Sequence, residues 1–261
     1  MAGEELARRI VERELKRAVH INDDGSTPGM YDLRVGSPHA PEMAIECVGA
    51  VDKIFTETWN VGPAKGPIEL SIKGDWIVTV TNKARIKIVK QRIEQILQVL
   101  EDQETYEIHV DYRLEYSDSK LFEKLESLGI THIACYRPQG TGKVHFGMPG
   151  IGGPVDTEGS SISKWVSTFL SETALKDVLQ KLKRSAAKER HVFLFVTFGG
   201  APWSVESYLT GDFEQLPSQG PDLPQPVTGV WIVSGFGQKG LRWNGATWQL
   251  FLARGEGIDD Q

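Results

Sequence analysis

The sequence is poor in the residues that build structural metal sites. It contains only 2 cysteines, Cys47 and Cys135, and both lie inside apolar stretches. Neither has a second cysteine or a histidine at zinc-ligand spacing, so we expect reduced core thiols and no structural zinc site. The 6 histidines form no HxH or HxxxH pair. We therefore expect each histidine to be structural or solvent-facing.

Long apolar runs are also missing. No stretch approaches the roughly 18 apolar residues that a membrane-spanning helix needs. Residues 1–17 are charged throughout, whereas a signal peptide has an apolar segment. These features predict a cytoplasmic protein that does not have a membrane as partner.

An excess of positive charge is missing as well, since the formal net charge is -6. Proteins dedicated to nucleic acid are usually basic, because neutralisation of phosphates supplies most of their affinity. Basic residues nevertheless cluster at 8–17, 83–92 and 176–190. Solvated helix faces are the simpler interpretation of each cluster. Any contact with nucleic acid is therefore expected to be weak and local.

The chain of 261 residues is 40% hydrophobic, which is enough for one large domain or two small ones. Apolar residues at helical spacing predict helices at 4–19, 83–102, 118–128 and 162–182. Alternation and β-branched residues predict strands at 30–35, 43–48, 68–74, 75–81, 105–116, 130–136, 191–198 and 227–236, and a final hairpin. Residues 137–159 are rich in Gly and Pro and are predicted to be a loop. The pattern indicates an α/β protein with a mixed β-sheet flanked by helices.

Three acids occupy unusual positions in this pattern. Alternation places Asp32 opposite the apolar residues of its strand, and places Glu46 on one face with Ala44 and Val48. An ionised carboxylate on an apolar face is costly unless it is paired or binds a metal. Glu14 adds a third acid, because helical spacing puts it on the apolar side of the first helix. Asp32, Glu46 and Glu14 are therefore candidate ligands for Mg²⁺, which prefers carboxylate oxygens.

The order of helix, strands, helix and strand over residues 4–116 resembles the core of the PD-(D/E)XK superfamily, the restriction-endonuclease-like fold. In that family an Asp and a Glu on neighbouring strands bind Mg²⁺, and many members add a Glu from the first helix. Asp32, Glu46 and Glu14 match these positions. The resemblance implies a nuclease-like core over residues 1–104. Residues 105–261 would be a C-terminal α/β extension of the same sheet or a second lobe.

The sequence departs from the family at one position. A Lys two residues after the Glu helps to activate the attacking water in that family, and here the position is Val48. Without a cation, water activation and charge stabilisation are weakened. Lys53, Lys73 and Lys90 are alternative sources. Lys90 flanks the apolar stripe of the helix at 83–102 and is expected to lean toward the site as a catalytic residue.

The resemblance also implies a place for two of the basic clusters. The helices at 4–19 and 83–102 would lie beside the metal site, so their basic residues would contact phosphates on either side of the scissile bond. Lys87 and Lys90 are the candidates in the second helix. Lys181 and Lys183 are expected to lie on a remote solvated face.

The resulting prediction is a Mg²⁺-dependent nuclease that hydrolyses DNA or RNA through a metal-activated water, with a role in bacterial defence or repair. One alternative is a catalytically inactive nuclease-like module that binds a protein or a nucleic acid. Another is that the acids are simply salt-bridged, with Arg34 or Arg17 as partner. An amine close to both acids would favour the enzyme, and Val48 packed against a closed apolar wall would favour the binding module.

Overall fold

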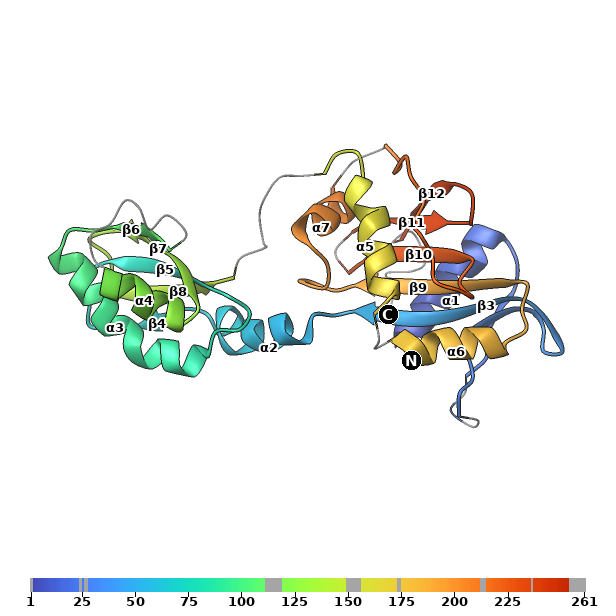
Figure 1. The fold of residues 1–261 in the computed structure, drawn as a ribbon, viewed down its shortest axis with the longest axis horizontal. Coiled ribbons are helices and arrows are strands. Elements are labelled where there is room, and N and C mark those ends of the chain that lie inside the picture. Colours follow the sequence, from blue (N-terminus) through green and yellow to red (C-terminus); the bar gives the residue numbers. More distant parts are fainter. Residues whose placement is uncertain are drawn as a thin grey trace. The chain divides into compact units, whose positions relative to one another are not determined.

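The computed structural model describes residues 2–23, 25, 28–110, 119–148, 156–172, 175–211, 215–235 and 237–253. The chain divides into two compact units, each seen in Figure 1. Unit 1 combines Met1–Val51 with Gly153–Gln261, and unit 2 is Asp52–Gly152. Unit 2 is thus inserted into the sequence of unit 1, and the division does not fall at residue 104 as predicted.

The elements of unit 1 come from both ends of the chain. They are α1 (Ala2–Leu15), β1 (Val19–Ile21), β2 (Leu33–Ser37), β3 (Ala40–Ala50), α5 (Ser160–Leu170), α6 (Lys176–Arg184), β9 (Glu189–Val196), α7 (Trp203–Thr210), β10 (Gly229–Ser234), β11 (Lys239–Trp243) and β12 (Trp248–Leu252). The strands form a seven-stranded sheet in the order β1-β2-β3-β9-β10-β11-β12.

The pairing of β3 with β9 explains why the two ends of the chain form one unit. β1, β2 and β3 are antiparallel neighbours, whereas β3 runs parallel to β9, with Ile45 opposite His191. β9 is parallel to β10, and β11 and β12 return antiparallel. A parallel pair needs a long crossover connection, and unit 2 together with α5 and α6 lies within that connection.

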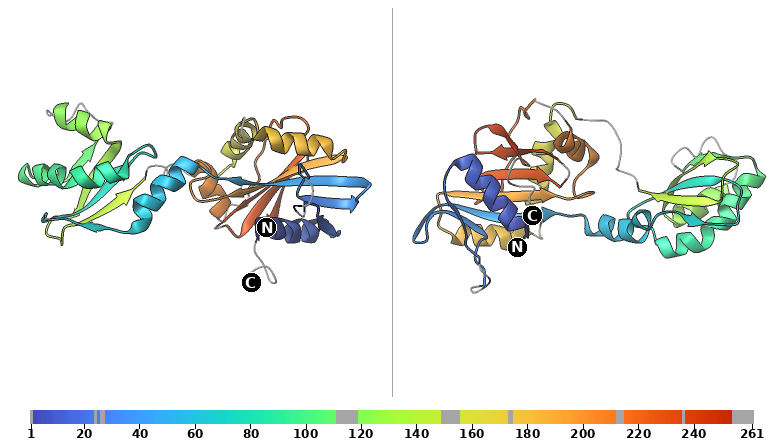
Figure 2. Two further views of the ribbon diagram at one scale, coloured as in Figure 1. Left: turned by 90° about the horizontal axis from the view of Figure 1, so that it is seen from below. Right: turned by 180° about the vertical axis from the view of Figure 1, so that it is seen from behind.

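Each face of this sheet has its own core, as Figure 2 shows for the helices on the two sides. α1 contributes Ala7, Ile10 and Val11 to a cluster that contains Ile45 and Phe193. The opposite cluster contains Ala44, Val48 and Val192, and the helices α5, α6 and α7 pack against it. Alternate residues of β3 therefore point to different helices.

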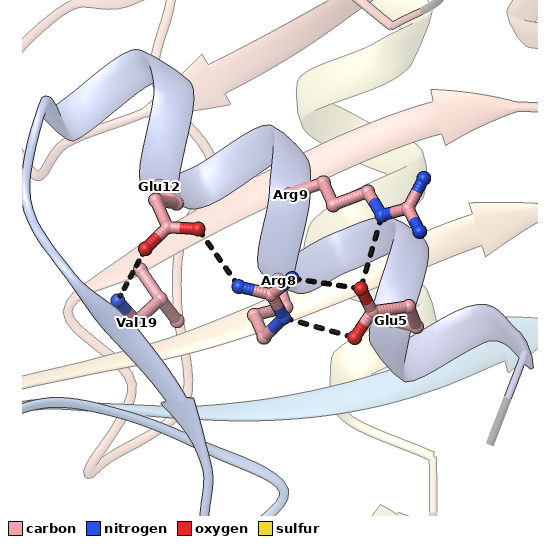
Figure 3. Close-up of polar contacts among 5 residues, drawn as sticks. All are labelled: Glu5, Arg8, Arg9, Glu12 and Val19. Atoms are coloured by element: carbon pink, nitrogen blue, oxygen red, sulfur yellow. Dashed lines mark hydrogen bonds and ion pairs between the residues drawn. The ribbon is translucent and has the colours of Figure 1, made fainter. Parts of the chain in front are cut away.

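A network of ion pairs ties α1 together and is drawn in Figure 3. The guanidinium of Arg8 bonds Glu5 and Glu12, and Arg9 also bonds Glu5. Glu12 accepts a further hydrogen bond from the backbone N–H of Val19, at the start of β1. The pairs at i,i+3 and i,i+4 stabilise the helix, and the last bond fixes the path from α1 into β1.

Unit 2 holds a second sheet. Its elements are α2 (Lys53–Val61), the 3₁₀ helix η1 (Pro63–Lys65), β4 (Ile68–Glu69), β5 (Asp75–Val80), α3 (Ile86–Asp102), β6 (Glu107–His109), α4 (Ser119–Ser127), β7 (Ile130–Arg137) and β8 (Lys143–Gly147). The strand order is β4-β8-β5-β7-β6. Trp76, Val78 and Val80 are buried on one face of β5, whereas Ile77 on the other face is exposed.

The α/β class with helices flanking mixed sheets is confirmed, but some predicted elements were wrong. The predicted loop at 137–159 contains β8, which runs parallel to β5. Just before β8, Gly142 permits a close approach to the chain that follows β4, because its φ is +74° and a Cβ would lie 2.2 Å from Leu70 O. The strand at 68–74 is reduced to β4, which pairs with β8 rather than β5. Of the strand at 105–116, residues 111–116 lie outside the described residues.

None of the helices in the described ranges is long and apolar enough to cross a bilayer. Cys47 and Cys135 are free and half-buried.

Candidate functional site

Two acids meet at the centre of unit 1. Asp32 directly precedes β2, and Glu46 lies in β3. The register pairs Leu33 with Ile45, so Asp32 and Glu46 are opposite each other on neighbouring strands. Glu46 shares its phase with Ala44 and Val48 and therefore faces α6 rather than α1.

Asp32 is held by β3, the strand that carries Glu46. Its exposure is 8%, and its Oδ2 accepts a hydrogen bond of 2.6 Å from the backbone N–H of Cys47. Burial raises the pKa of Asp32, although the Cys47 N–H and the charge of Lys181 oppose the rise. The hydrogen bond fixes the orientation of the carboxylate toward β3.

Glu46 lies in a less favourable environment. Its exposure is 3%, and among the described residues its Oε1 is a buried oxygen without a hydrogen-bond donor. Burial and the neighbouring charge of Asp32 raise the pKa of Glu46 to about 8, against the pull of Lys181. A buried carboxylate without enough donors keeps a proton at neutral pH. The two acids therefore share a site that is suited to a positive ion.

The cation nearest to the pair comes from α6. The Nζ of Lys181 lies 3.5 Å from Glu46 Oε1, which allows an ion pair but is long for a hydrogen bond. Burial lowers the pKa of Lys181, but the charges of Glu46 and Asp32 raise it more, so the net direction is upward. The predicted remote, solvated position of Lys181 was therefore wrong, whereas Lys183 on the same helix is exposed.

Glu14 is not brought to this pair by any described contact. It is exposed and forms an ion pair of 3.0 Å with Arg13. The physical reason is that α1 covers the other face of the sheet from Glu46, where the charge of Glu14 acts on Arg242 of β11. The acid of α1 whose charge acts on Asp32 is Glu4.

Lys90 belongs to unit 2 and has partners there. Its Nζ donates to Val61 O at 3.1 Å and lies 5.5 Å from the centre of the Phe146 ring. Lys53 and Lys73 also belong to unit 2. These contacts give Lys90 a structural role in its own unit, namely joining α3 to the end of α2.

The arginines proposed as simple salt-bridge partners are engaged with other groups. Arg34 donates to Asn22 and to Gly36 O. Arg17 bonds Glu42 at 2.7 Å. Val48 is buried in the apolar cluster beside the pair. Thus an amine reaches Glu46 and acts on Asp32 through its charge, which meets only part of the enzyme criterion, while Val48 forms the apolar wall that the binding-module hypothesis requires.

The two predicted basic surfaces differ in the contacts that the structure describes for them. The arginines of α1 are already paired with acids of the same helix. In unit 2, by contrast, the basic residues before and within α3 line a hollow of about 500 Å³. Lys83, Arg85 and Arg92 lie on its wall with Glu126.

The donor set at Asp32 and Glu46 fits a hard divalent cation. It offers carboxylate oxygens, and one of them is buried with no described donor. A bound cation would offset the burial that raises the pKa of both acids and the charge of Asp32 that raises the pKa of Glu46 further. No family model, curated protein or solved structure matches this chain.

Proposed function

We propose that unit 1 is a Mg²⁺-dependent phosphodiesterase acting on DNA or RNA, of the PD-(D/E)XK type. Asp32 and Glu46 would hold the ion, and Lys181 would replace the lysine that the sequence lacks at Val48. The observation that carries the proposal is the Lys181 amine, 3.5 Å from the buried carboxylate of Glu46. A role in bacterial defence or repair would suit such an activity.

The topology of unit 1 supports the proposal. α1 is followed by three antiparallel strands, and after two further helices β9 returns parallel to β3. The resemblance implies the order helix, strands, helix and strand, but the helix at 83–102 that suggested it belongs to unit 2, so in unit 1 this order would be supplied by α5, α6 and β9. Asp32 directly precedes the second of these strands and Glu46 lies on the third, and in the family the two acids lie on neighbouring strands.

Each residue would have a separate task in hydrolysis. Mg²⁺, when bound, supplies Lewis-acid polarisation and lowers the pKa of water. Cys47 N–H orients Asp32 through its hydrogen bond. Glu46, whose pKa is raised, would have to release its proton to solvent in order to hold the ion. Lys181 would donate to the phosphate or to the attacking water, where an ammonium stabilises developing negative charge.

One observation favours a second candidate, the inactive module that binds a protein or a nucleic acid. Glu46 has an exposure of only 3%, and Val48 beside it is packed in the apolar core. A phosphodiester would then need a change of conformation to reach the pair. In this case Lys181 would only neutralise Glu46 within the fold.

Cleavage and metal binding together test the proposal. Single-stranded and duplex substrates would be incubated at low salt with Mg²⁺ or Mn²⁺. We expect cleavage by the wild type, unchanged cleavage by Lys183→Met, and a loss of roughly 10²–10⁴-fold in Lys181→Met, the range for a positioned acid or base. Mn²⁺ should raise the melting temperature of the wild type but not of Asp32→Asn, because only the native site binds the ion.

The negative outcomes of these two experiments would lead to different conclusions. Metal-dependent stabilisation without cleavage would support the inactive module. Identical melting curves in Mn²⁺ and in EDTA, again without cleavage, would reduce the pair to structural acids. Equal loss of cleavage in Lys181→Met and Lys183→Met would remove the assigned role of Lys181.

A further inference from the structure

A cluster of one acid and two histidines lies on the sheet of unit 2. Glu107 and His109 are two residues apart in β6, so they point to the same face. His132 lies in β7 directly opposite His109. The outermost position in the strand order belongs to β6, so the cluster lies at an edge of this sheet.

The three side chains converge on one point. Nε2 of His109 lies 3.0 Å from Glu107 Oε1, and Nε2 of His132 lies 3.1 Å from the same oxygen. The two imidazole rings are stacked, with centroids 4.1 Å apart and planes inclined by 18°. One ligand atom from each residue lies within 4.8 Å of the others. Cross-strand pairing therefore places two nitrogens and one oxygen around a common position.

We propose that Glu107, His109 and His132 bind a transition-metal ion of the Zn²⁺ class. Imidazole nitrogen is a preferred ligand of Zn²⁺ and its neighbours, whereas Mg²⁺ prefers oxygen. An ion with bonds of about 2.0–2.2 Å to three such ligands holds the ligand atoms roughly 3–3.5 Å apart. The nitrogen–oxygen separations of 3.0 and 3.1 Å are close to that spacing.

The exposure of the cluster determines what kind of metal site it would be. The side chains of Glu107, His109 and His132 are 61%, 46% and 28% exposed. An ion could therefore enter from solution without opening the fold. Three protein ligands with an open fourth position are typical of sites that exchange water or an outside ligand, whereas structural zinc sites are closed by four protein ligands.

This site is independent of the acid pair in unit 1. The pair offers only carboxylate oxygens, and the cluster offers mainly imidazole nitrogens, so the two should select different ions. Without a metal, both imidazoles would act as N–H donors to Glu107. With a metal, both Nε2 atoms must present lone pairs, so each ring would carry its proton on Nδ1.

Calorimetric titration of the full chain with Zn²⁺, in a non-coordinating buffer, tests the proposal. We expect one saturable site in the wild type. His109→Asn and His132→Asn should each bind at least roughly tenfold more weakly, since even indirect supports of a metal site cost 10–100-fold. His145→Asn is the matched control, because His145 is exposed on β8 of the same sheet and should bind as the wild type does.

Two further measurements keep the result unambiguous. Binding by Glu46→Gln, and by the wild type in excess Mg²⁺, should be unchanged, which separates this site from the acid pair. Glu107→Gln gives a second test if a histidine variant does not fold. Absence of saturable Zn²⁺ binding in the wild type, or undiminished binding in both His109→Asn and His132→Asn, would overturn the proposal.

Discussion

Two buried carboxylates, one in each unit, show opposite behaviour. Asp75 in unit 2 has an exposure of 2%, and Glu46 in unit 1 has an exposure of 3%. Asp75 Oδ1 accepts hydrogen bonds from Thr141 N, Lys143 N and the Thr141 hydroxyl. Those donors lower the pKa of Asp75. Burial raises the pKa of Glu46 to about 8, because its donors are too few.

The comparison shows that burial alone does not identify a functional acid. Asp75 fixes the turn between β7 and β8, and its negative charge is satisfied by the backbone. Glu46 keeps an oxygen for which the described residues provide no donor. A buried group that the fold leaves unsatisfied is a candidate for binding a ligand. The four predictions below test this contrast.

The largest effect is expected for Asp75→Ala. The substitution removes the charged acceptor of the N–H groups of Thr141 and Lys143, and hydrogen bonds to charged groups are stronger than those between neutral groups. We expect the melting temperature of unit 2 to fall by on the order of 10 °C. Differential scanning calorimetry would follow it, with Glu69→Ala as an exposed control. An unchanged transition would mean that the turn is held by other contacts.

Glu46→Gln should have the opposite effect on stability and should stabilise the protein. The folded-state pKa of Glu46 is raised from 4.5 to about 8, so the folded protein retains a proton that the unfolded chain releases. Stability from this group is full below the lower value and is lost as the pH rises toward the upper one. We expect Glu46→Gln to be more stable than the wild type by about 1–3 kcal/mol at pH 8 and to be similar at pH 4.5.

Urea unfolding at both pH values would measure this difference. The same series with Asp75→Asn is the control, since its acid has a lowered pKa and should show no gain at pH 8. A loss of stability in Glu46→Gln at pH 8 would mean that Glu46 is ionised and satisfied in the fold.

Lys181→Met should change the stability less, and the size of this change should depend on whether Glu46 is present. The variant leaves the buried carboxylate without its cation, and we expect a loss of about 1–2 kcal/mol at pH 8 for this partly exposed pair. In the Glu46→Gln background the loss should largely disappear. A double-mutant cycle in urea measures this coupling. Additive losses would show that Lys181 acts through packing rather than through charge.

The smallest effect is expected for Glu14→Gln. Its carboxylate is exposed and paired with Arg13. Surface ion pairs contribute little, so the change in stability should be within about 0.5 kcal/mol. Stabilisation by Mn²⁺ should also be unchanged. Loss of that stabilisation would restore Glu14 to the metal site that the sequence suggested.

Much of the fold was predictable from periodicity, and so was the position of the acid pair. The stripe in α3 and the alternation in β3 are strong local signals, and alternation alone placed Glu46 among apolar neighbours. The parallel pairing of β3 with β9 joins residues that are far apart in sequence, so no local pattern announced the insertion of unit 2. β8 was missed because Gly and Pro on both sides hid the alternation of Val144 and Phe146.

The cations and histidines were harder to predict. Lys181 belongs to a strongly basic helix, and only the packing of α6 on the sheet distinguishes it from Lys183. The Glu107 cluster depends on the register of β6 and β7, because His109 and His132 belong to different strands. Glu-x-His in a strand was the available signal. Histidine spacing within one segment carries no information about partners on a neighbouring strand.

The insertion of unit 2 has a consequence for how unit 1 folds. Glu46 must find Val192 across the whole inserted segment, a separation that includes roughly 100 residues of unit 2. Contacts of long sequence separation slow folding, because the entropy of closing the loop is lost before the contact forms. If unit 2 folds first, its contacts replace a long flexible loop by a compact insert and shorten the effective distance between β3 and β9. Lys181 would then be among the last groups to reach Glu46, because α6 follows the insertion, whereas Asp32 and Glu46 need only the local pairing of β2 with β3.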